Sequence, residues 1–524
     1  VLAFAPRYRR ASVSVPDRAV LERLAELPGV QLLAPDYGAV TRAGSVDSRA
    51  VPALNVDSIG AGTAADLTGA GVTVGILSDS FARTGDVVDG DTAFDGADLG
   101  DTGPKTAPVT MTASAPQDSG DLPAEIELLR DDAGGSVNDE GAAMAELVHD
   151  LAPGAAIVFH TATAGGIAGF ADAIDELCSG PGAVDVVVDD IGFLAELMYQ
   201  RDAVSRAAAE CVARGVAFFS AAGNLGDRAF RATFRDLIAS DDDEGRAALF
   251  PADERDFHDW SGGDAYLRID VPANAETSAV LQWNQPALSV PANGGNGPRV
   301  DLDLLVFASP SPSSPLTAVS SVVDQRAGDA GAGQDPVEVV RLSGGAGGTT
   351  YYLAIDHWAG AQASIPQDEG TALEFRLVFY ENGGRATIEY LDSPGGPGPA
   401  PTMYGHTVAD GVLAVGAVPW YDAPAFPGAV TGATARVDPQ SFTARGGTLE
   451  RHFAPGGAFR LGTRPPQPAI AAVDGNNTTF FRPDRWTDLG LGAEDGEDDG
   501  IPNFFGTSAA APNAAAVAAL LLED

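Results

Sequence analysis

Short apolar runs alternate with helical patterns in the first half of the chain. The runs occupy residues 72–79, 155–162, 184–190 and 216–224, and helical patterns lie near 140–151, 167–178 and 198–214. Continuous apolar runs separated by helices are typical of parallel strands buried on both faces. We therefore predict an α/β fold, with a parallel sheet that is covered by helices on both sides. The same pattern resumes at residues 411–418 and 468–473 and ends in an Ala/Leu-rich helix.

Between these two parts the periodicity changes. Apolar and polar positions alternate in residues 278–284, 301–307 and 351–356, Gly and Pro turns are frequent, and helical patterns are nearly absent. Such alternation is typical of antiparallel strands. We predict that residues 255–395 form a β-sandwich. This all-β domain would be inserted into an α/β domain of residues 50–250 and 400–524, preceded by a separate segment, 1–45.

The charge balance excludes several classes of partner. The chain has 524 residues, of which 31 are basic and 73 acidic, and its net charge is -42. Nucleic acid and anionic membranes are poor partners for such a surface. No apolar run reaches the roughly 18 residues of a membrane span. We see no signal peptide, and because residues 1–10 read like the middle of a domain, we expect a trimmed amino terminus.

Cysteines and acidic loops leave the question of metals open. Cys178 and Cys211 cannot form a four-ligand zinc site alone, and a bridge between them is neither required nor excluded. The acidic stretches 86–101 and 494–500 could bind structural calcium or could be solvated loops. We expect no cofactor to be required for chemistry.

The strongest chemical signal is "GTSAAAP", in which Ser508 lies at the start of the last helix. A hydroxyl there lies near the positive end of the helix, which favours a developing oxyanion. A plain N-cap serine would look the same. However, "GTSAAAP" resembles the serine motif of the subtilisin-like peptidases, or subtilases. In addition, "VTVGILSDS" resembles their first strand, ending in a catalytic Asp79, and "FFSAAGN" resembles the strand that ends in their oxyanion-hole asparagine, Asn224.

The chain departs from subtilases at the catalytic base. Subtilases carry a histidine followed by glycine at a helix start, and here that place reads "DEGAAM", with Glu140 in the histidine position. Glu140 lies on the same helical face as Met144 and the apolar stripe that follows it. A glutamate in a first turn also simply complements the helix dipole. His149 is nine residues further on and points to roughly the opposite side of a helix, so it is rejected as a substitute base.

The sedolisins, which share the subtilisin-like fold, use a Ser-Glu-Asp triad and work best in acid. The chain resembles them at Glu140 but departs at Met144 and Asn224, where sedolisins have aspartates. It therefore resembles an intermediate, sedolisin-like group, in which Asp79 would be the partner of Glu140. Two close carboxylates share a proton, which raises one pKa. Asp190 ends the third apolar run and is either an accessory acid or an ordinary strand-end residue.

These resemblances imply a secreted serine endopeptidase that acts on peptide or protein substrates and tolerates acid. Residues 1–45 resemble the end of a subtilase propeptide, and the insert resembles β-sandwich modules of secreted bacterial peptidases. A catalytically inactive subtilase scaffold that binds or adheres through its sandwich is the alternative, and a surface structural protein is a third. Because Ser508, Asp79 and Asn224 are all retained, the enzyme is favoured. The substrate preference and the oligomeric state stay open.

Overall fold

The computed structural model describes most of residues 3–523. The residues left out are 57–66, 85–86, 88–108, 132–136, 238–255, 312–313, 321–323, 327–332, 358–371, 393–399, 427–436, 464–466, 482–501 and shorter gaps, most of which precede residue 48. The predicted acidic stretches 86–101 and 494–500 therefore lie outside the described residues, apart from Val87.

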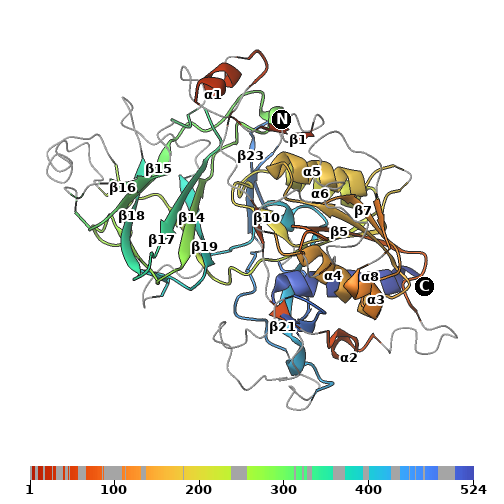
Figure 1. The fold of residues 1–524 in the computed structure, drawn as a ribbon. Coiled ribbons are helices and arrows are strands. Elements are labelled where there is room, and N and C mark those ends of the chain that lie inside the picture. The colour runs from red at the N-terminus through yellow and green to blue at the C-terminus, as the bar shows by residue number, and fades with distance from the viewer. Residues whose placement is uncertain are drawn as a thin grey trace, which may run out of the picture.

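A mixed α/β architecture is confirmed, with a large, mostly parallel sheet that lies among helices in the right-hand part of Figure 1. In the described part of the chain its order is β24-β21-β11-β9-β5-β8-β7-β6. Every neighbouring pair is parallel except β6 with β7. The strands are β5 (Thr73–Ser78), β6 (Val109–Met111), β7 (Ile126–Arg130), β8 (Ala156–Thr161), β9 (Val186–Asp189), β11 (Ala217–Ala221), β21 (Leu413–Pro419) and β24 (Ile470–Asp474).

Helices cover both faces of this sheet. Successive strand residues point to opposite faces, so Ile76 joins the core under α4 (Glu140–Leu151) and α8 (Thr507–Glu523). Leu77 joins the core under α5 (Gly166–Leu177) and α6 (Ala203–Ala213). The helices agree with the predicted patterns, except that α6 begins five residues later than residue 198. The reason is that Asp202 caps it by accepting a hydrogen bond from Ser205 N.

Two antiparallel sheets follow in the middle of the chain. The first has the order β12-β19-β14-β17 and the second β16-β15-β18-β13-β20. They share one apolar core, which includes Trp283, Leu304 and Phe375. The strands are β12 (Ala229–Thr233), β13 (Leu267–Val271), β14 (Glu276–Trp283), β15 (Leu302–Phe307), β16 (Leu316–Val319), β17 (Val337–Ser343), β18 (Thr349–His357), β19 (Glu374–Asn382) and β20 (Thr387–Ile388).

Strand β12 precedes the boundary that the sequence predicts at residue 255, yet it pairs with β19. The ion pairs of Arg228 fix this junction, because its guanidinium contacts Glu381 at 2.9 Å and Asp392 at 2.9 Å. The antiparallel region therefore takes one strand from the sequence that leads into it. Its independence as an inserted domain stays a prediction.

The amino-terminal segment lies against several parts of the molecule. Strands β1 (Ala3–Ala5) and β2 (Arg10–Ser12) pair with each other and lie against α5. They are followed by α1 (Arg18–Ala25), β3 (Ala39–Thr41), β4 (Ser45–Val46) and α2 (Ala50–Leu54). Short elements elsewhere are β10 (Ile191–Phe193), the 3-10 helix η5 (Gly405–Val408), the hairpin β22 (Leu449–Phe453) and β23 (Phe459–Thr463), β25 (Asn476–Asn477) and β26 (Asn503–Phe504).

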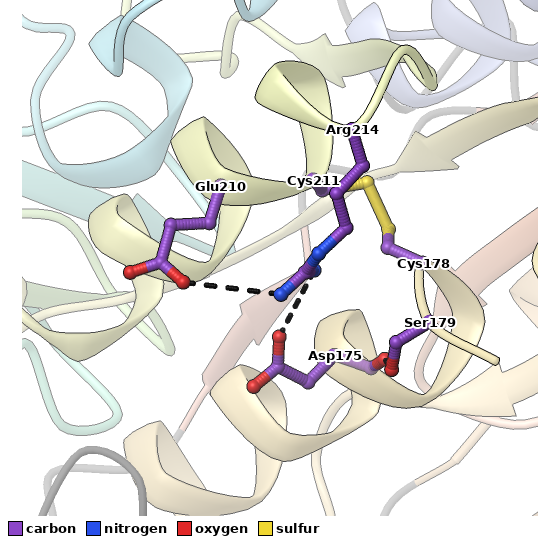
Figure 2. The surroundings of a disulfide bond; sticks show 6 residues. All are labelled: Asp175, Cys178, Ser179, Glu210, Cys211 and Arg214. Atoms are coloured by element: carbon purple, nitrogen blue, oxygen red, sulfur yellow. Dashed lines mark hydrogen bonds and ion pairs between the residues drawn. A yellow bond between two sulfur atoms is a disulfide. The ribbon is translucent and has the colours of Figure 1, made fainter.

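Cys178 and Cys211 form a disulfide that joins the end of α5 to α6 (Figure 2). Both residues are buried. Beside the bridge, Arg214 binds Asp175 at 3.2 Å and Glu210 at 3.9 Å. Sequence alone left this pairing open, because it depends on how the two helices pack.

No helix in the described ranges is long and apolar enough to cross a membrane. Within the same ranges, no group of three or more His, Cys, Asp or Glu side chains is placed to hold a metal ion.

Candidate active site

The candidate site lies at the carboxyl edge of the parallel sheet. Asp79 follows β5 and Asp190 follows β9, and these two strands are neighbours. Asn224 follows the next strand, β11, by three residues. The carboxyl ends of parallel strands are where ligands bind in open α/β sheets. Ser508 reaches the same place from above the sheet, as the second residue of α8.

Glu140 is the first residue of α4, and its neighbours in sequence fix its position. Asp139 adopts a left-handed conformation, with φ of 58°, and its carboxylate accepts hydrogen bonds from Arg83 N and Thr84 N. Gly141 is packed so closely that a Cβ would meet Phe159 of β8 at 2.4 Å and the carbonyl of Ser80, just after β5, at 2.7 Å. The residues "DEG" therefore form a tightly packed helix start, which places Glu140 at the end of the sheet.

Asp79 is held by the backbone at that helix start. Its Oδ2 accepts a hydrogen bond from Asn138 N at 2.9 Å, and its Oδ1 accepts one from Glu140 N at 3.1 Å. Burial nevertheless raises the pKa of Asp79 from 3.8 to about 7, the Asp190 charge adds to the rise, and the Asn138 and Ser80 amides oppose it. A carboxyl group that is buried among other carboxyl groups has a raised pKa, because lost solvation and like charges both destabilise its ionised form.

Glu140 is fully buried, and its carboxyl group faces both Asp190 and Ser508. Burial raises the pKa of Glu140 well above 4.5, and the nearby carboxyl group of Asp190 and the charge of Asp79 raise it further. An interaction with the Ser508 hydroxyl lowers it. The two carboxylate oxygens of Glu140 and Ser508 Oγ make no well-aligned hydrogen bond to any residue that the structure describes. These groups are thus within range of one another without ideal geometry, as is common in catalytic sites before substrate binds.

The turn before Ser508 is fixed by two polar side chains, the buried Asp474 and the half-buried Asn224. Gly506 has a φ of 111°, and its N–H donates to Asp474 Oδ2 at 3.0 Å. Asn224 Oδ1 accepts hydrogen bonds from Thr507 N and Thr507 Oγ1, both at 3.0 Å. The amide of Asn224 therefore lies beside the start of α8, and its donor group is Nδ2.

The structure thus brings together the residues that the sequence singled out: Asp79, Glu140, Asp190, Asn224 and Ser508. One detail differs from the expected pairing. Asp79 bonds the backbone of Glu140, whereas the side chain of Glu140 interacts more strongly with Asp190 than with Asp79. From the sequence, Asp190 was predicted to be at most an accessory acid. Sequence alone does not show whether Asp189 or Asp190 points toward the site.

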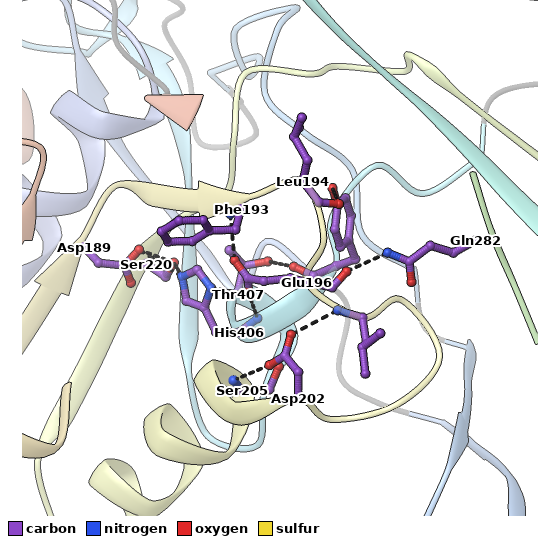
Figure 3. A network of polar contacts seen from close by, with 12 residues as sticks. Asp189, Phe193, Leu194, Glu196, Asp202, Ser205, Ser220, Gln282, His406 and Thr407 are labelled. Carbon is purple, nitrogen blue, oxygen red and sulfur yellow. Dashed lines mark hydrogen bonds and ion pairs between the residues drawn. The ribbon is translucent and has the colours of Figure 1, made fainter. Parts of the chain in front are cut away.

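Two further groups escaped the sequence analysis. Asp474 ends β24 at the same edge of the sheet, is fully buried, and has a pKa raised by burial to about 7. Its position at a strand end could have been read from "PAIAAVD". The second group is His406, which the structure places in a buried polar network under β10 (Figure 3).

Two short strands of the amino-terminal segment flank the site. Strand β3 pairs antiparallel with β10, which begins directly after Asp190. Strand β4 pairs antiparallel with β26, which ends three residues before Thr507. The side chains of Asp190, Glu140 and Ser508 have no exposed surface, and that of Asp79 is 3% exposed.

Comparison with known proteins adds little to this geometry. No family model matches the chain, and no curated protein matches it. Among solved structures, two that are similar to this chain are proteases. One, the CspB protease of Clostridium perfringens, is 13% identical over 90% of this chain and 86% of its own, with a TM-score of 0.35. The other, a protease of Pseudoalteromonas arctica PAMC 21717, is 17% identical over 33% of this chain and 53% of its own, with a TM-score of 0.20. Similarities this low carry no argument, so function must be argued from the site.

Proposed function

We propose that the protein is a serine endopeptidase with Ser508 as nucleophile, Glu140 as general base, Asp79 and Asp190 as its acidic partners, and Asn224 in the oxyanion hole. One observation carries the proposal. A buried carboxyl group of raised pKa faces both a serine at a helix start and a second carboxyl group. Strongly perturbed acids grouped around a nucleophile are typical of active sites.

In the proposed reaction, Ser508 Oγ attacks the carbonyl carbon of a peptide bond while its proton passes to the ionised carboxylate of Glu140. The oxygen of that carbonyl takes up negative charge next to Asn224 Nδ2 and the amides at the start of α8, which stabilise it. The C–N bond then breaks, and Glu140 returns the proton to the leaving amine. Water repeats the sequence on the acyl-enzyme and frees Ser508.

Substrate would bind as an added strand. One edge of β10 pairs with the backbone of β3, and β26 pairs with that of β4, so each strand already holds an extended segment. Strand addition of this kind is a common mode of peptide recognition. We propose that residues 1–45 are a propeptide remnant and that its β3, with β4 directly after it, covers the site as a substrate would.

The resemblance to sedolisin-like enzymes also motivates secretion and activity in mild acid. Acid activity requires that part of the carboxyl cluster stays ionised. The raised pKa values of Glu140 and Asp79 act against it, because they move the acid limb of the pH profile above the 4.3 of free glutamate, so acid activity rests on the resemblance alone. Structural calcium in the acidic loops stays open, and the proposed chemistry requires no metal.

An active-site probe tests the proposal directly. A fluorophosphonate should label Ser508 in the wild-type protein and should fail to label Ser508→Ala. Ser205→Ala is the matched control, since Ser205 is also buried in the first turn of a helix, and it should label like the wild type. Equal labelling of all three proteins would remove Ser508 from the mechanism.

The complete burial of Ser508 is the observation that favours the alternative, an inactive scaffold. The two functions differ after limited proteolysis of the amino-terminal segment. Labelling and casein cleavage between pH 3 and 8 should increase when β3 and β4 are removed from an enzyme. An inactive scaffold would stay unlabelled under every condition.

A further inference from the structure

A second buried charge cluster lies directly beneath β10 (Figure 3). His406, in η5, has no exposed surface, and its Nδ1 lies 2.7 Å from Glu196 Oε2. Its Nε2 lies 3.0 Å from Asp189 Oδ1 and 3.2 Å from Ser220 Oγ. An imidazole can meet two carboxylates in this way only when both nitrogens carry protons, that is, as an imidazolium.

The electrostatics agree with this protonation state. The two carboxylates outweigh burial and raise the pKa of His406 to about 10. In turn, the imidazolium lowers the pKa of Glu196 even though burial acts to raise it. A buried charge pair of this kind keeps its geometry, because breaking it leaves an uncompensated charge in the interior.

Each member of the cluster is attached to a different part of the proposed site. Asp189 ends β9 and is followed by Asp190. Ser220 belongs to β11, the strand that leads to Asn224. Glu196 accepts a hydrogen bond from Phe193 N, the last residue of β10, through its other oxygen at 2.9 Å.

The cluster also contacts the antiparallel region, and it is packed too closely for an added side-chain atom. Gln282 of β14 donates to Glu196 O at 2.7 Å and accepts from Met198 N at 2.8 Å. The backbone of η5 approaches so closely that a Cβ on Gly405 would lie 2.2 Å from Glu196 Oε2. The loop after β10 is therefore held from both sides.

We propose that His406, Glu196 and Asp189 form an imidazolium clamp whose function is to hold β10 in place as the binding strand for peptide substrates. His406 is thus a positioning residue: it touches neither the nucleophile nor the substrate and acts through β10. This inference rests on the proposed peptidase function. Because the clamp acts on the strand that pairs with substrate and not on the reacting atoms, its loss should weaken binding more than chemistry.

The test compares His406→Gln with the wild-type full-length protein on a peptide substrate. KM should rise about tenfold while kcat stays within about threefold, the pattern expected when ground-state binding is lost. His258→Gln is the matched control: His258 is equally buried, but it lies in the antiparallel region and accepts from Arg235 N. It should leave KM unchanged. A His406→Gln variant with wild-type KM would overturn the clamp.

Hydrogen exchange at residues 191–193 separates this inference from the proposed function. Exchange there should be faster in His406→Gln than in the wild type and unchanged in His258→Gln, whether or not the protein is a peptidase. An inactive wild-type protein would count against the proposed function alone, and exchange would then decide the clamp. If His406→Gln does not fold, His406→Gln/Glu196→Gln removes one of the two carboxylates left without their cation and is measured in its place. Wild-type exchange rates in the variant measured would overturn the inference.

Discussion

The carboxyl edge of the parallel sheet and the junction of the two antiparallel sheets both gather carboxylates, but in opposite surroundings. At the junction, the buried Arg228 pairs with the partly exposed Glu381 and Asp392. Burial acts to raise the pKa of Asp392, but the Ile388 amide and Arg228 together lower it. At the sheet edge, the neighbouring charges that act most strongly on Asp79 and Glu140 are those of other carboxylates. Opposite charges in contact fix the geometry of a structure. Groups of like charges lower stability, and they are typical of functional sites.

Two buried histidines repeat this contrast. His406 lies between two carboxylates, which raise its pKa to about 10. His258 lies among the rings of Trp260 and Phe375, and burial lowers its pKa to about 4. The same side chain is therefore a charged clamp in one region and a neutral packing group in the other.

The largest expected effect is on turnover. Glu140→Gln keeps the shape of the side chain and removes the proton acceptor, so kcat should fall by at least about 100-fold, while the thermal midpoint is unchanged or higher. Glu146→Gln is the control, because Glu146 is a buried acid on the same helix whose pKa burial raises to about 8. It should retain turnover. Peptide hydrolysis and thermal melts measure both, and a Glu140→Gln variant that still cleaves would show that the base is another group.

Next comes the stability of the antiparallel junction. Arg228→Met removes the buried cation between Glu381 and Asp392, which are partly exposed, and Asp392 keeps a contact with Arg385. It should lower the free energy of unfolding by about 1–3 kcal/mol. Urea titration measures the loss. A variant as stable as the wild type would show that the Arg228 ion pairs do not stabilise the junction, which would contradict the contrast between the two regions.

The pH dependence of stability sharpens the comparison further. Asp79 and Asp474 have pKa values of about 7 in the folded state, and Glu146 has one of about 8. Because these values exceed those of the unfolded chain, the groups stabilise the fold fully below about pH 4, and their contribution is lost as the pH rises through 7 to 8.

His258 opposes this trend, since its depressed pKa makes its contribution disappear as the pH falls from about 6.5 to 4. His406 acts in the same direction as the acids, with stability lost as the pH rises toward 10. The thermal midpoint should therefore increase from pH 8 to pH 5. A midpoint that falls over this range would mean that the buried acids are not protonated in the folded protein.

The smallest expected effect is a shift of the pH–rate profile. Asp190 is the largest cause, after burial, of the raised pKa of Glu140, so Asp190→Asn should move the acid limb of kcat/KM downward by about one pH unit. Asp410→Asn, at an exposed ion pair with Arg201, should leave the limb in place. An upward shift in Asp190→Asn would show that Asp190 supports ionisation of Glu140.

Much of the α/β framework followed from periodicity. The apolar runs that end at Asp79 and Asp190 are strands at the expected places, and Glu140 begins a helix as "DEG" predicts. Local sequence contains this information because strands and helix starts are specified by nearby residues. The local sequence also predicted Ser508 at the start of the last helix, where the structure has it.

Long-range contacts could not be obtained in this way. The bridge between Cys178 and Cys211 depends on the packing of two helices. The preference of Glu140 for Asp190, and the meeting of His406 with Glu196 across 210 positions, depend on strand order. Strand β12 lies before residue 255 yet pairs with β19, and local sequence does not show this because the partner strand lies far along the chain.

The position of α8 has a consequence for biosynthesis. This last described helix completes the core over β5 and β9, and Glu523 at its end binds the backbone of Thr68, 455 positions earlier. On a ribosome, where earlier parts of a chain fold first, the antiparallel region can form while α8 is still unmade. Ser508 can join Glu140 only after α8 has been made, so the proposed active site stays incomplete while the preceding parts of the chain fold.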